Sequence, residues 1–578
     1  MRSRSVERFR RRPAETQRKE LERLLRECAR TEFGRRYGFG EIRTPEAFAQ
    51  RVERFDYTSF KPYVERMMAG EADVAAPGRV RWFARSSGTT SERSKYLPVT
   101  DVSLWRCHTR GLRDVATLYV GQYPSTRVFE GKTLTLGGTC SKSGGIVVGD
   151  LSALLVERTS FWSGWFRTPR RETALLADFD EKVERICREC ASERVTAFAG
   201  VPSWNLALLR RMVEYTGRRN LCEVWPHLEL FAHGGVGFEP YRAAFRELIP
   251  SAGMHYMETY NASEGFFAIA DDASRDDMLL MLDYGTYYEF RDGDEVVPLE
   301  GVQAGRRYAM LISSCNGLWR YELGDVVEFT STDPYRIRVA GRTRQFINAF
   351  GEEVVMENAE RAVTVAAEAT GAVVSEYTAG PRYMTLHGRG AHEWIVEFGR
   401  APESFDAFVQ KLDGELMRLN SDYEAKRRST MAPPEMHVVP AGTFARWMLR
   451  RGKNKVPRLA NDRRVLEDVL ATTAEQDAAV GVRGERPWRL WCRGSPAAVG
   501  VARAVSCEST SPHGATARST VGKMAAGTSG GRCELITKEN IEFRFRLNPS
   551  LWQREGRRGG NVGIRAAAMR GVNVRRQV

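Results

Sequence analysis

The first segment whose residue types suggest chemistry is a hydroxyl-rich loop, RSSGTTSERSK, at residues 85–95. Hydroxyl groups and unhindered backbone N–H groups can wrap a phosphate chain, and Lys95 places a cation at the end of the loop. The GxxxxGK(S/T) pattern of a Walker A loop does not occur here. The candidate phosphate ligands are Ser86, Ser87, Gly88, Thr89 and Thr90. The residue types favour a phosphate-binding loop, with a polar surface loop as the alternative.

A second candidate segment is YNASEG, at residues 260–265. Glu264 can hold a Mg²⁺ ion that bridges phosphates, because Mg²⁺ prefers few protein carboxylates plus phosphate oxygens. Tyr260 can stack on a flat base. Taken alone, however, the segment is more typical of a helix N-terminus capped by Ser263.

Two further segments carry charged side chains beside glycines. In GLWRYELGDVVEF, residues 317–329, the Asp325 carboxylate can accept hydrogen bonds from both hydroxyls of a ribose. An aspartate in a hairpin turn is the alternative there, and the better one without context. In GRTRQFINAFGEE, residues 341–353, Arg342 lies where the sequence texture changes, as a hinge residue would; a basic linker is the alternative.

The last candidate segment is RGKNKVPR, at residues 451–458. Lys453 and Lys455 lie on a predicted loop before Pro457. A lysine here can reach a developing phosphate charge if a small domain closes over the site. Taken alone, a solvated basic loop explains the segment better.

Together, in this order along the chain, the five segments resemble the adenylate-forming superfamily of acyl- and aminoacyl-activating enzymes. Additional segments make the chain similar to the Gretchen Hagen acyl-acid amido synthetases, whose plant members conjugate auxin and jasmonate to amino acids. These segments are TEFGRRYGF (31–39), YTSFKPYVERM (57–67), KYLPVT (95–100), GVPSW (200–204), HGGVGFEPY (233–241), YYEF (287–290) and LNSDYEAKR (419–427). Each motif alone is weak, whereas the ordered set is specific.

The resemblance implies an acid–amino acid ligase that uses ATP and Mg²⁺. Such an enzyme adenylates a small carboxylic acid, then transfers the acyl group to the amine of an amino acid and releases AMP and pyrophosphate. The catalytic residues it implies are Lys455, Glu264 (as the Mg²⁺ ligand) and Lys95. The nucleotide-binding residues it implies are the loop at 86–95, Gly234, Gly235 and Val236 beside adenine, Tyr260 and Ser263 in the second motif, Asp325 at the ribose and Arg342 at the hinge. Lys455 fits better than Lys453, because KVPR resembles the family pattern.

Three other functions are considered. An acyl-CoA ligase shares the first half-reaction and differs only in the acceptor. A serine hydrolase would use Ser87 or Ser263, but neither lies in a GxSxG elbow. A nucleic-acid-binding protein would have to rely on the C-terminal segment, which lacks a recognised RNA- or DNA-binding motif.

The elements that must position these residues follow from the hydrophobic pattern. Through residues 80–340, short β-prone runs alternate with helical stretches, which predicts α/β layers with a largely parallel sheet. The apolar spacing from Leu21 to Cys28 predicts a helix, and so does the stretch 403–420. The expected class is α/β. A large N-terminal adenylate-forming domain with mixed β-sheets and flanking helices (1–345) precedes a smaller, mobile α+β C-terminal domain (346–480) and a basic tail (481–578).

Composition and charge limit the partners. The chain has 578 residues, of which 42% are hydrophobic and 28% charged, with a formal net charge of +14. Residues 481–578 hold 18 Lys and Arg against 6 Asp and Glu, so +12 of that charge lies there, in a Gly- and Arg-rich segment expected to have little stable structure. We expect small carboxylic acids and amino acids as partners and no nucleic acid except through this tail. The sequence leaves the oligomeric state open.

Two absences bear on location. No window of 18 apolar residues occurs, and no apolar run follows the N-terminal MRSRSVERFRRRP, so neither a transmembrane helix nor a secretory signal is predicted. Ten scattered cysteines favour free thiols in a reducing compartment, which predicts a cytoplasmic protein without membrane contact.

Overall fold

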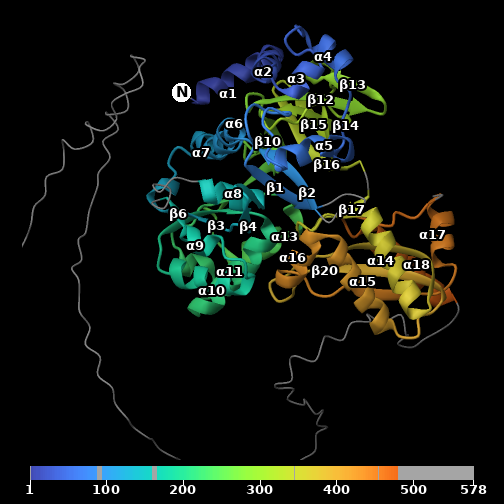
Figure 1. Ribbon diagram of the computed structural model, residues 1–578. Coiled ribbons are helices and arrows are strands. Elements are labelled where there is room, and N and C mark those ends of the chain that lie inside the picture. Colours follow the sequence, from blue (N-terminus) through green and yellow to red (C-terminus); the bar gives the residue numbers. More distant parts are fainter. Residues whose placement is uncertain (1, 88–93, 159–165, 344, 453–454, 480–578) are drawn as a thin grey trace, which may run out of the picture. The chain divides into compact units, whose positions relative to one another are not determined.

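The computed structural model describes residues 2–87, 94–158, 166–343, 345–452 and 455–479 (Figure 1). The predicted loop residues Gly88, Thr89 and Thr90 lie outside the described residues, as do Lys453 and the basic segment 481–578. The mixed α/β class expected from the sequence is confirmed, with a large N-terminal and a smaller C-terminal domain.

Helices precede the first strand. They are α1 (Arg2–Arg11), α2 (Pro13–Cys28), α3 (Glu32–Arg36), α4 (Pro45–Arg51) and α5 (Tyr57–Met68). The predicted apolar face of α2 is confirmed, since Leu21, Leu24 and Cys28 are all buried. The Thr31 hydroxyl starts α3 by accepting a hydrogen bond of 2.9 Å from the Gly34 backbone N–H, a typical N-cap.

A twelve-stranded sheet lies at the centre of the large domain, in the order β13-β12-β14-β15-β16-β11-β10-β9-β8-β7-β3-β6. Its strands are β3 (Lys132–Thr135), β6 (Arg167–Thr168), β7 (Val195–Gly200), β8 (Leu230–Gly234), β9 (His255–Ala262), β10 (Gly265–Ile269), β11 (Met278–Leu280), β12 (Thr286–Asp292), β13 (Glu295–Pro298), β14 (Arg307–Ser314), β15 (Tyr321–Thr332) and β16 (Tyr335–Arg342). Neighbours from β9 to β6 are parallel, and neighbours from β13 to β9 are antiparallel. The prediction of a largely parallel sheet is therefore wrong for one half, where tight hairpins such as β15–β16 impose antiparallel pairing.

Further helices follow α5 along the chain, and a second, four-stranded sheet carries both ends of the hydroxyl-rich loop. The helices are α6 (Asp101–Ser103), a π-helical segment Leu104–Thr109, α7 (Arg110–Gln122), α8 (Leu151–Arg158), α9 (Arg171–Ala174), α10 (Phe179–Cys190), α11 (Pro202–Thr216), α12 (Leu221–Val224) and α13 (Glu239–Leu248). Figure 1 shows α9, α10 and α11 beside β3 and β6. The second sheet has the order β2-β1-β5-β4, with β1 (Trp82–Ser87), β2 (Ser94–Val99), β4 (Cys140–Ser143) and β5 (Ile146–Gly149).

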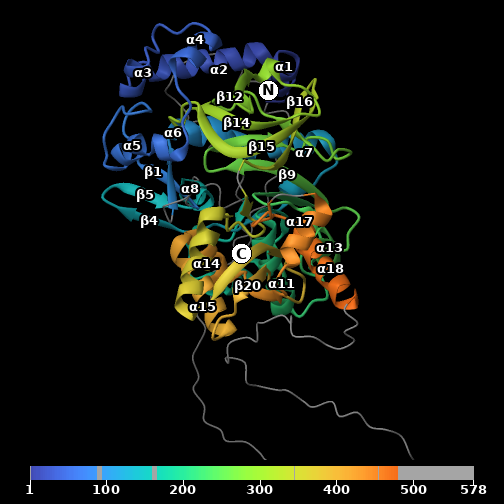
Figure 2. The same ribbon diagram turned by 90° about the vertical axis from the view of Figure 1, so that its right-hand side faces the viewer.

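The smaller domain has its own three-stranded sheet, in the order β19-β20-β21. Its elements are β17 (Phe346–Ile347), β18 (Val354–Val355), α14 (Met356–Thr370), β19 (Val373–Arg382), β20 (Ala391–Arg400), α15 (Phe405–Leu419), α16 (Ser421–Ser429), β21 (Glu435–Val439), α17 (Thr443–Arg451) and α18 (Arg464–Ala479). The helix predicted over 403–420 is confirmed as α15, which packs against α14 (Figure 2). Phe408, Leu412 and Leu416 on one face of this helix are buried.

Across the described ranges, each helix is either too short or too polar to cross a bilayer.

Candidate functional site

Three residues predicted to bind the nucleotide, Tyr260, Asp325 and Arg342, meet around the Asp325 carboxylate. Tyr260 on β9 donates its hydroxyl hydrogen bond to Asp325 Oδ2 on β15, although 65 residues separate them in the chain. Arg342 Nε on β16 lies 2.8 Å from the other oxygen, Asp325 Oδ1. The pairing of β15 with β16 sets Asp325 directly opposite Arg342. The β15–β16 register brings Asp325 and Arg342 together. Tyr260 reaches Asp325 from β9, a strand that pairs with neither β15 nor β16.

Asp325 does not lie in a hairpin turn, which was the alternative favoured by its sequence context alone. It lies inside the twelve-residue strand β15, next to Gly324, whose φ is +83°. This left-handed glycine conformation suits a local irregularity in the strand, and the β15–β16 register shifts between Val326 and Val327.

Glu264 lies in a β-turn rather than at a helix N-terminus. Ala262 at the end of β9 pairs with Gly265 at the start of β10, so Ser263 and Glu264 connect two antiparallel strands, and Ser263 caps no helix. Burial raises the pKa of the Glu264 carboxyl to about 7, while the positive charge of Lys95 opposes the shift and the Asp325 carboxylate adds to it. The turn thus presents a half-buried carboxylate close to the Tyr260–Asp325–Arg342 cluster.

Lys95 lies within electrostatic reach of Glu264, as its effect on that pKa shows. It is 7% exposed on β2, with its ammonium 5.8 Å from the centre of the Tyr57 ring. On the neighbouring strand Ser86 pairs with Lys95, so the β1–β2 hairpin carries the ends of the hydroxyl-rich loop. Of that loop, Arg85, Ser86, the backbone of Ser87, Ser94 and Lys95 are described.

Gly234, Gly235 and Val236 lie at the carboxyl end of β8. Gly234 pairs with Thr259, the residue before Tyr260, and a Cβ atom on Gly234 would lie 2.3 Å from the Thr259 carbonyl oxygen. Only glycine allows this close approach, which explains its place in the motif. The carboxyl ends of adjacent parallel strands are where open α/β sheets usually bind ligands.

Among the described site residues, Lys455 has no contact with this cluster. It is exposed at the start of the segment that leads to α18. Within the described ranges, its ammonium makes no hydrogen bond or ion pair with the carboxylate of Glu264 or Asp325.

Four residues beside the cluster, Glu353, Asn420, Asp422 and Lys426, are not among the predicted ligands. Arg342 also forms an ion pair with Glu353, which is 8% exposed and has a left-handed φ of +38°. The Asn420 side-chain N–H donates 3.0 Å to the Glu353 carbonyl, so the N-cap of α16 adjoins the site. Asp422 and Lys426 follow on α16. Both occur in LNSDYEAKR, one of the segments that carry the family resemblance. The spacing of residues in that segment does not predict contact with the nucleotide site.

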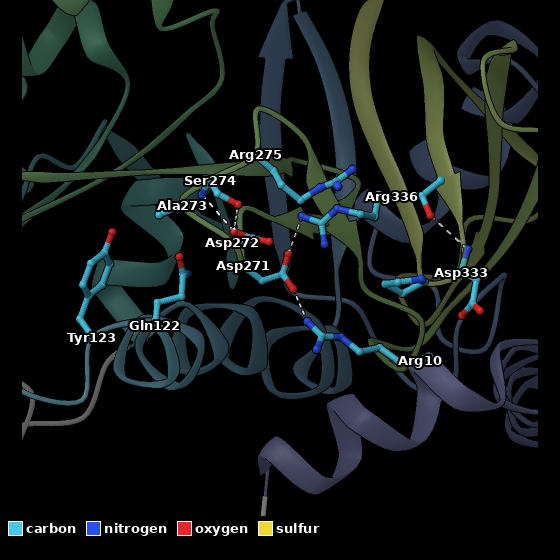
Figure 3. A pocket seen from close by; sticks show the side chains of 12 residues that line it. Arg10, Gln122, Tyr123, Asp271, Asp272, Ala273, Ser274, Arg275, Asp333 and Arg336 are labelled. Carbon is cyan, nitrogen blue, oxygen red and sulfur yellow. Dashed lines mark hydrogen bonds and ion pairs between the residues drawn. The ribbon is translucent and has the colours of Figure 1, made fainter.

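A separate polar cavity of about 600 Å³ contains none of the predicted ligands. Figure 3 shows Arg10, Asp271 and Arg336 converging in it. Arg336 NH2 lies 2.8 Å from Asp271 Oδ1, and Arg10 forms an ion pair with the other oxygen of the same carboxylate. The charges are largely neutralised internally, which indicates a structural network.

The residues present suit a Mg²⁺ ion held mainly by phosphates. In the part of the chain that the structure describes, no three His, Cys, Asp or Glu side chains gather into a metal-binding set. Mg²⁺ is commonly held by one or two carboxylates together with phosphate oxygens and water. A single half-buried Glu264 fits that pattern.

Models of three domains of one protein family match successive segments of this chain. The GH3 family N-terminal domain matches residues 2–254, its central domain 279–342 and its C-terminal domain 357–464. The chain is similar to the putative indole-3-acetic acid-amido synthetase GH3.9 of Arabidopsis thaliana, with 24% identity over 45% of this chain and 46% of the relative. That match therefore spans about half the length of the curated relative. The chain is also similar to indole-3-acetic acid-amido synthetase GH3.4 of the same plant, with 22% identity over 78% of this chain and 90% of the relative.

Two solved structures share the fold. The GH3.15 acyl acid amido synthetase aligns with a TM-score of 0.50 and 19% identity, covering 79% of this chain and 93% of that one. A 2-hydroxyisobutyryl-CoA ligase in complex with 2-HIB-AMP and CoA aligns with a TM-score of 0.51 and 14% identity, covering 80% and 92%. Because the N-terminal, central and C-terminal domains of one family follow one another along this chain, it is a member of the GH3 family.

Proposed function

We propose that this chain is an ATP-dependent acyl-acid amido synthetase, which adenylates a small carboxylic acid and transfers the acyl group to an amino acid. The observation that carries the proposal is the junction of Tyr260, Asp325 and Arg342 beside the Glu264 carboxylate. The amido-synthetase names of the Arabidopsis thaliana relatives support the same activity.

The nucleotide would bind across the carboxyl ends of β8 and β9. Each oxygen of Asp325 accepts one bond within the protein and retains a further lone pair, so the carboxylate can still accept the two ribose hydroxyls. Gly234, Gly235 and Val236 would lie beside adenine, and the loop at 86–95 would hold the phosphates.

Glu264 would hold the Mg²⁺ ion. When bound, the ion offsets negative charge on the phosphate oxygens. Lys95 adds a positive charge near Glu264, as its effect on the pKa of that carboxyl indicates.

The chemistry separates a difficult substitution into two easier steps. The substrate carboxylate attacks the α-phosphorus of ATP, which gives an acyl-adenylate and pyrophosphate. The amine of the amino acid then attacks the acyl carbon and AMP leaves. Positioning and electrostatic stabilisation by Lys95, Lys455 and the loop N–H groups would supply most of the rate, without a covalent acyl-enzyme.

Lys455 reaches the phosphates only if the small domain moves. We assign residues 1–345 to the nucleotide- and acyl-binding domain and 346–480 to a mobile C-terminal domain. Arg342 lies at the end of β16, just before this boundary, and a hinge motion there would bring the exposed Lys455 towards the site.

We place the reaction in the cytoplasm. All seven cysteines within the described ranges are free thiols, as suits a reducing compartment.

ATP–pyrophosphate exchange with a panel of small carboxylic acids tests the adenylation step. The wild type should exchange with at least one acid, and Asp325→Ala and Lys455→Ala should each lower exchange about tenfold or more, because each removes a contact to ribose or to developing phosphate charge. Lys411→Ala, at an exposed lysine of α15, is the matched control and should exchange like the wild type. Wild-type exchange in both site variants would contradict the assigned roles.

The acceptor is tested separately. Mass spectrometry of reactions supplied with amino acids or with coenzyme A should detect an amide and no thioester. A thioester alone would make the chain an acyl-CoA ligase, which shares the first half-reaction.

A further inference from the structure

The helix α16 carries two opposite charges that the proposed adenylation chemistry does not use. We propose that Lys426 and Trp204 hold the α-carboxylate of the acceptor amino acid, and that Asp422 holds its ammonium group and accepts a proton from it. This inference rests on the proposed function and names the acceptor subsite within it.

Lys426 is a buried cation that forms no direct ion pair within the described ranges, although its charge acts on Asp422. Its residue is 7% exposed, and its Nζ lies 4.3 Å from the centre of the Trp204 ring. Within the described ranges it forms no ion pair and donates no side-chain hydrogen bond. Buried charges are normally paired, because removing an isolated charge from water is costly. An ammonium in this state favours an anionic ligand.

Trp204 adds a second donor with no partner. Its indole Nε1 is buried and has no hydrogen-bond acceptor among the described atoms. Buried polar groups usually have partners, so this exception needs an explanation. One carboxylate placed between the Lys426 ammonium and the indole edge would satisfy both donors.

Asp422 lies one helical turn before Lys426, and residues four apart share one face of a helix. Burial raises the pKa of the Asp422 carboxyl to about 6; Lys426 and Arg85 lower it, and Asp150 and Glu353 raise it further. Within the described ranges, the Asp422 carboxylate forms no hydrogen bond or ion pair. A carboxylate close to two others favours a cationic ligand such as an ammonium group.

The pair adjoins the nucleotide site. Ser421 Oγ, the residue before Asp422, lies 2.8 Å from Ser94 Oγ at the end of the hydroxyl-rich loop. Glu353, which affects the pKa of Asp422, forms an ion pair with Arg342. An amino acid bound here would therefore lie next to the expected position of the phosphates.

The charges match an amino acid and not a thiol cofactor. A free amino acid at neutral pH presents a carboxylate and an ammonium group on one carbon atom, so it complements a cation and an anion on one helix face. The reactive end of coenzyme A is a neutral thiol, which offers neither charge to this pair.

Amide formation requires the ammonium group to lose two protons. One N–H bond of the ammonium breaks, and its proton goes to the Asp422 carboxylate. The freed nitrogen lone pair forms the C–N bond to the acyl carbon, while the bond from that carbon to the phosphate oxygen breaks and AMP leaves with the electron pair. A second nitrogen proton goes to solvent, which leaves a neutral amide.

The experiment compares acceptors on the full-length protein. Amide formation is measured with an amino acid, its methyl ester and the corresponding amine without a carboxylate, beside ATP–pyrophosphate exchange. For Lys426→Met, the KM for the amino acid should rise about tenfold or more, while the KM for the two acceptors without a carboxylate should change less than about twofold. Lys426→Arg keeps the cation and should preserve most of the preference for the amino acid.

The role of Asp422 has its own readout. In the wild type, amide formation should rise with pH through about 6, because the carboxylate is the proton acceptor and is protonated at lower pH. Asp422→Asn should lower amide formation about tenfold more than it lowers exchange, and it should remove this pH limb. Arg428→Ala, at an exposed arginine of the same helix, is the control for general effects on α16.

The failures are distinguishable. A wild type that exchanges with no acid overturns the proposed function itself. A wild type that exchanges and forms amides, with Lys426→Met and Asp422→Asn behaving like Arg428→Ala, overturns only the acceptor subsite. If Lys426→Met lowered amide formation equally with all three acceptors, Lys426 would have a structural role and the subsite would be rejected. The same conclusion would follow if both Lys426 variants lost the near-ultraviolet circular dichroism spectrum of the folded protein.

Discussion

Arg342 lies among three acidic side chains. Burial lowers its pKa, but the carboxylates of Glu353, Asp325 and Glu264 more than offset this effect and raise the pKa above its ordinary value. The arginine is therefore held between the ribose-binding candidate Asp325 and Glu353, which belongs to the small domain.

Tyr260 supports this arrangement with its hydroxyl group. Tyr260→Phe should raise the KM for ATP in the exchange reaction about fivefold or more, because a buried carboxylate loses a hydrogen bond worth about 1–3 kcal/mol. The fold should persist, since the ring keeps its contact with Phe267, whose centre lies 5.0 Å away. The measurement is the ATP dependence of exchange at saturating acid.

Tyr215→Phe, at a half-exposed tyrosine on α11, serves as the comparison for removal of a hydroxyl. An unchanged KM for ATP in Tyr260→Phe would show that the hydroxyl does not position Asp325 for the nucleotide.

Among the elements, β20 and β21 of the small domain are joined by a charged cluster in addition to their backbone pairing. Glu393 on β20 accepts a hydrogen bond of 2.7 Å from His437 Nε2 on β21 and a second from Arg463, just before α18. Burial alone would raise the pKa of Glu393, but these hydrogen bonds lower it to about 2. The carboxylate thus ties two strands and the start of α18 together.

This pKa sets a pH-dependent contribution to stability. A folded pKa below the unfolded value of 4.5 stabilises the fold above that pH, and the contribution is lost as pH falls from 4.5 to about 2. Glu393→Gln should lower the free energy of unfolding at pH 7 by on the order of 3 kcal/mol. The variant should also show a smaller decrease in that free energy as the pH falls from 4.5 to about 2. Urea unfolding followed at several pH values measures both.

Glu368→Gln, at an exposed glutamate of α14, is the matched control. Parallel stability–pH curves for Glu393→Gln and the wild type would reject the role of this cluster in acid stability.

At the scale of the whole molecule, charge and predicted function separate along the chain. All predicted ligands lie between Ser86 and Lys455, and the family domains end at residue 464. The segment 481–578 carries +12 of the total charge of +14. Any electrostatic attraction to nucleic acid would therefore come from that segment.

Deletion of residues 481–578 should leave exchange within about twofold of the full chain and should abolish salt-sensitive binding to an RNA fragment, because polyanion binding depends on neutralised phosphates. Exchange kinetics and RNA titrations at two salt concentrations test both expectations. Loss of exchange would mean that the segment contributes to the enzyme, and retained RNA binding would locate the basic surface elsewhere.

The fold was predicted best where the pattern was local. The helix α2 and the apolar face of α15 follow from periodicity, because one buried face repeats every three or four residues. The antiparallel half of the large sheet was not predicted, since β-prone runs show where strands lie but not which strand pairs with which. The turn at Glu264 looked like a capped helix for the same reason, because Ser263 suits either structure.

The sequence alone determined the family resemblance, the α/β class and the set of groups able to bind a nucleotide. It could do so because motifs and hydrophobic periodicity depend on residues that are neighbours in the chain. Only the tertiary structure decided that Tyr260, Asp325 and Arg342 meet, that Lys455 lies exposed apart from them, and that Lys426 is buried against Trp204. The physical reason is that strand register and burial join residues far apart in the chain. Contacts of this kind set which charges are paired, and they leave no trace in local spacing.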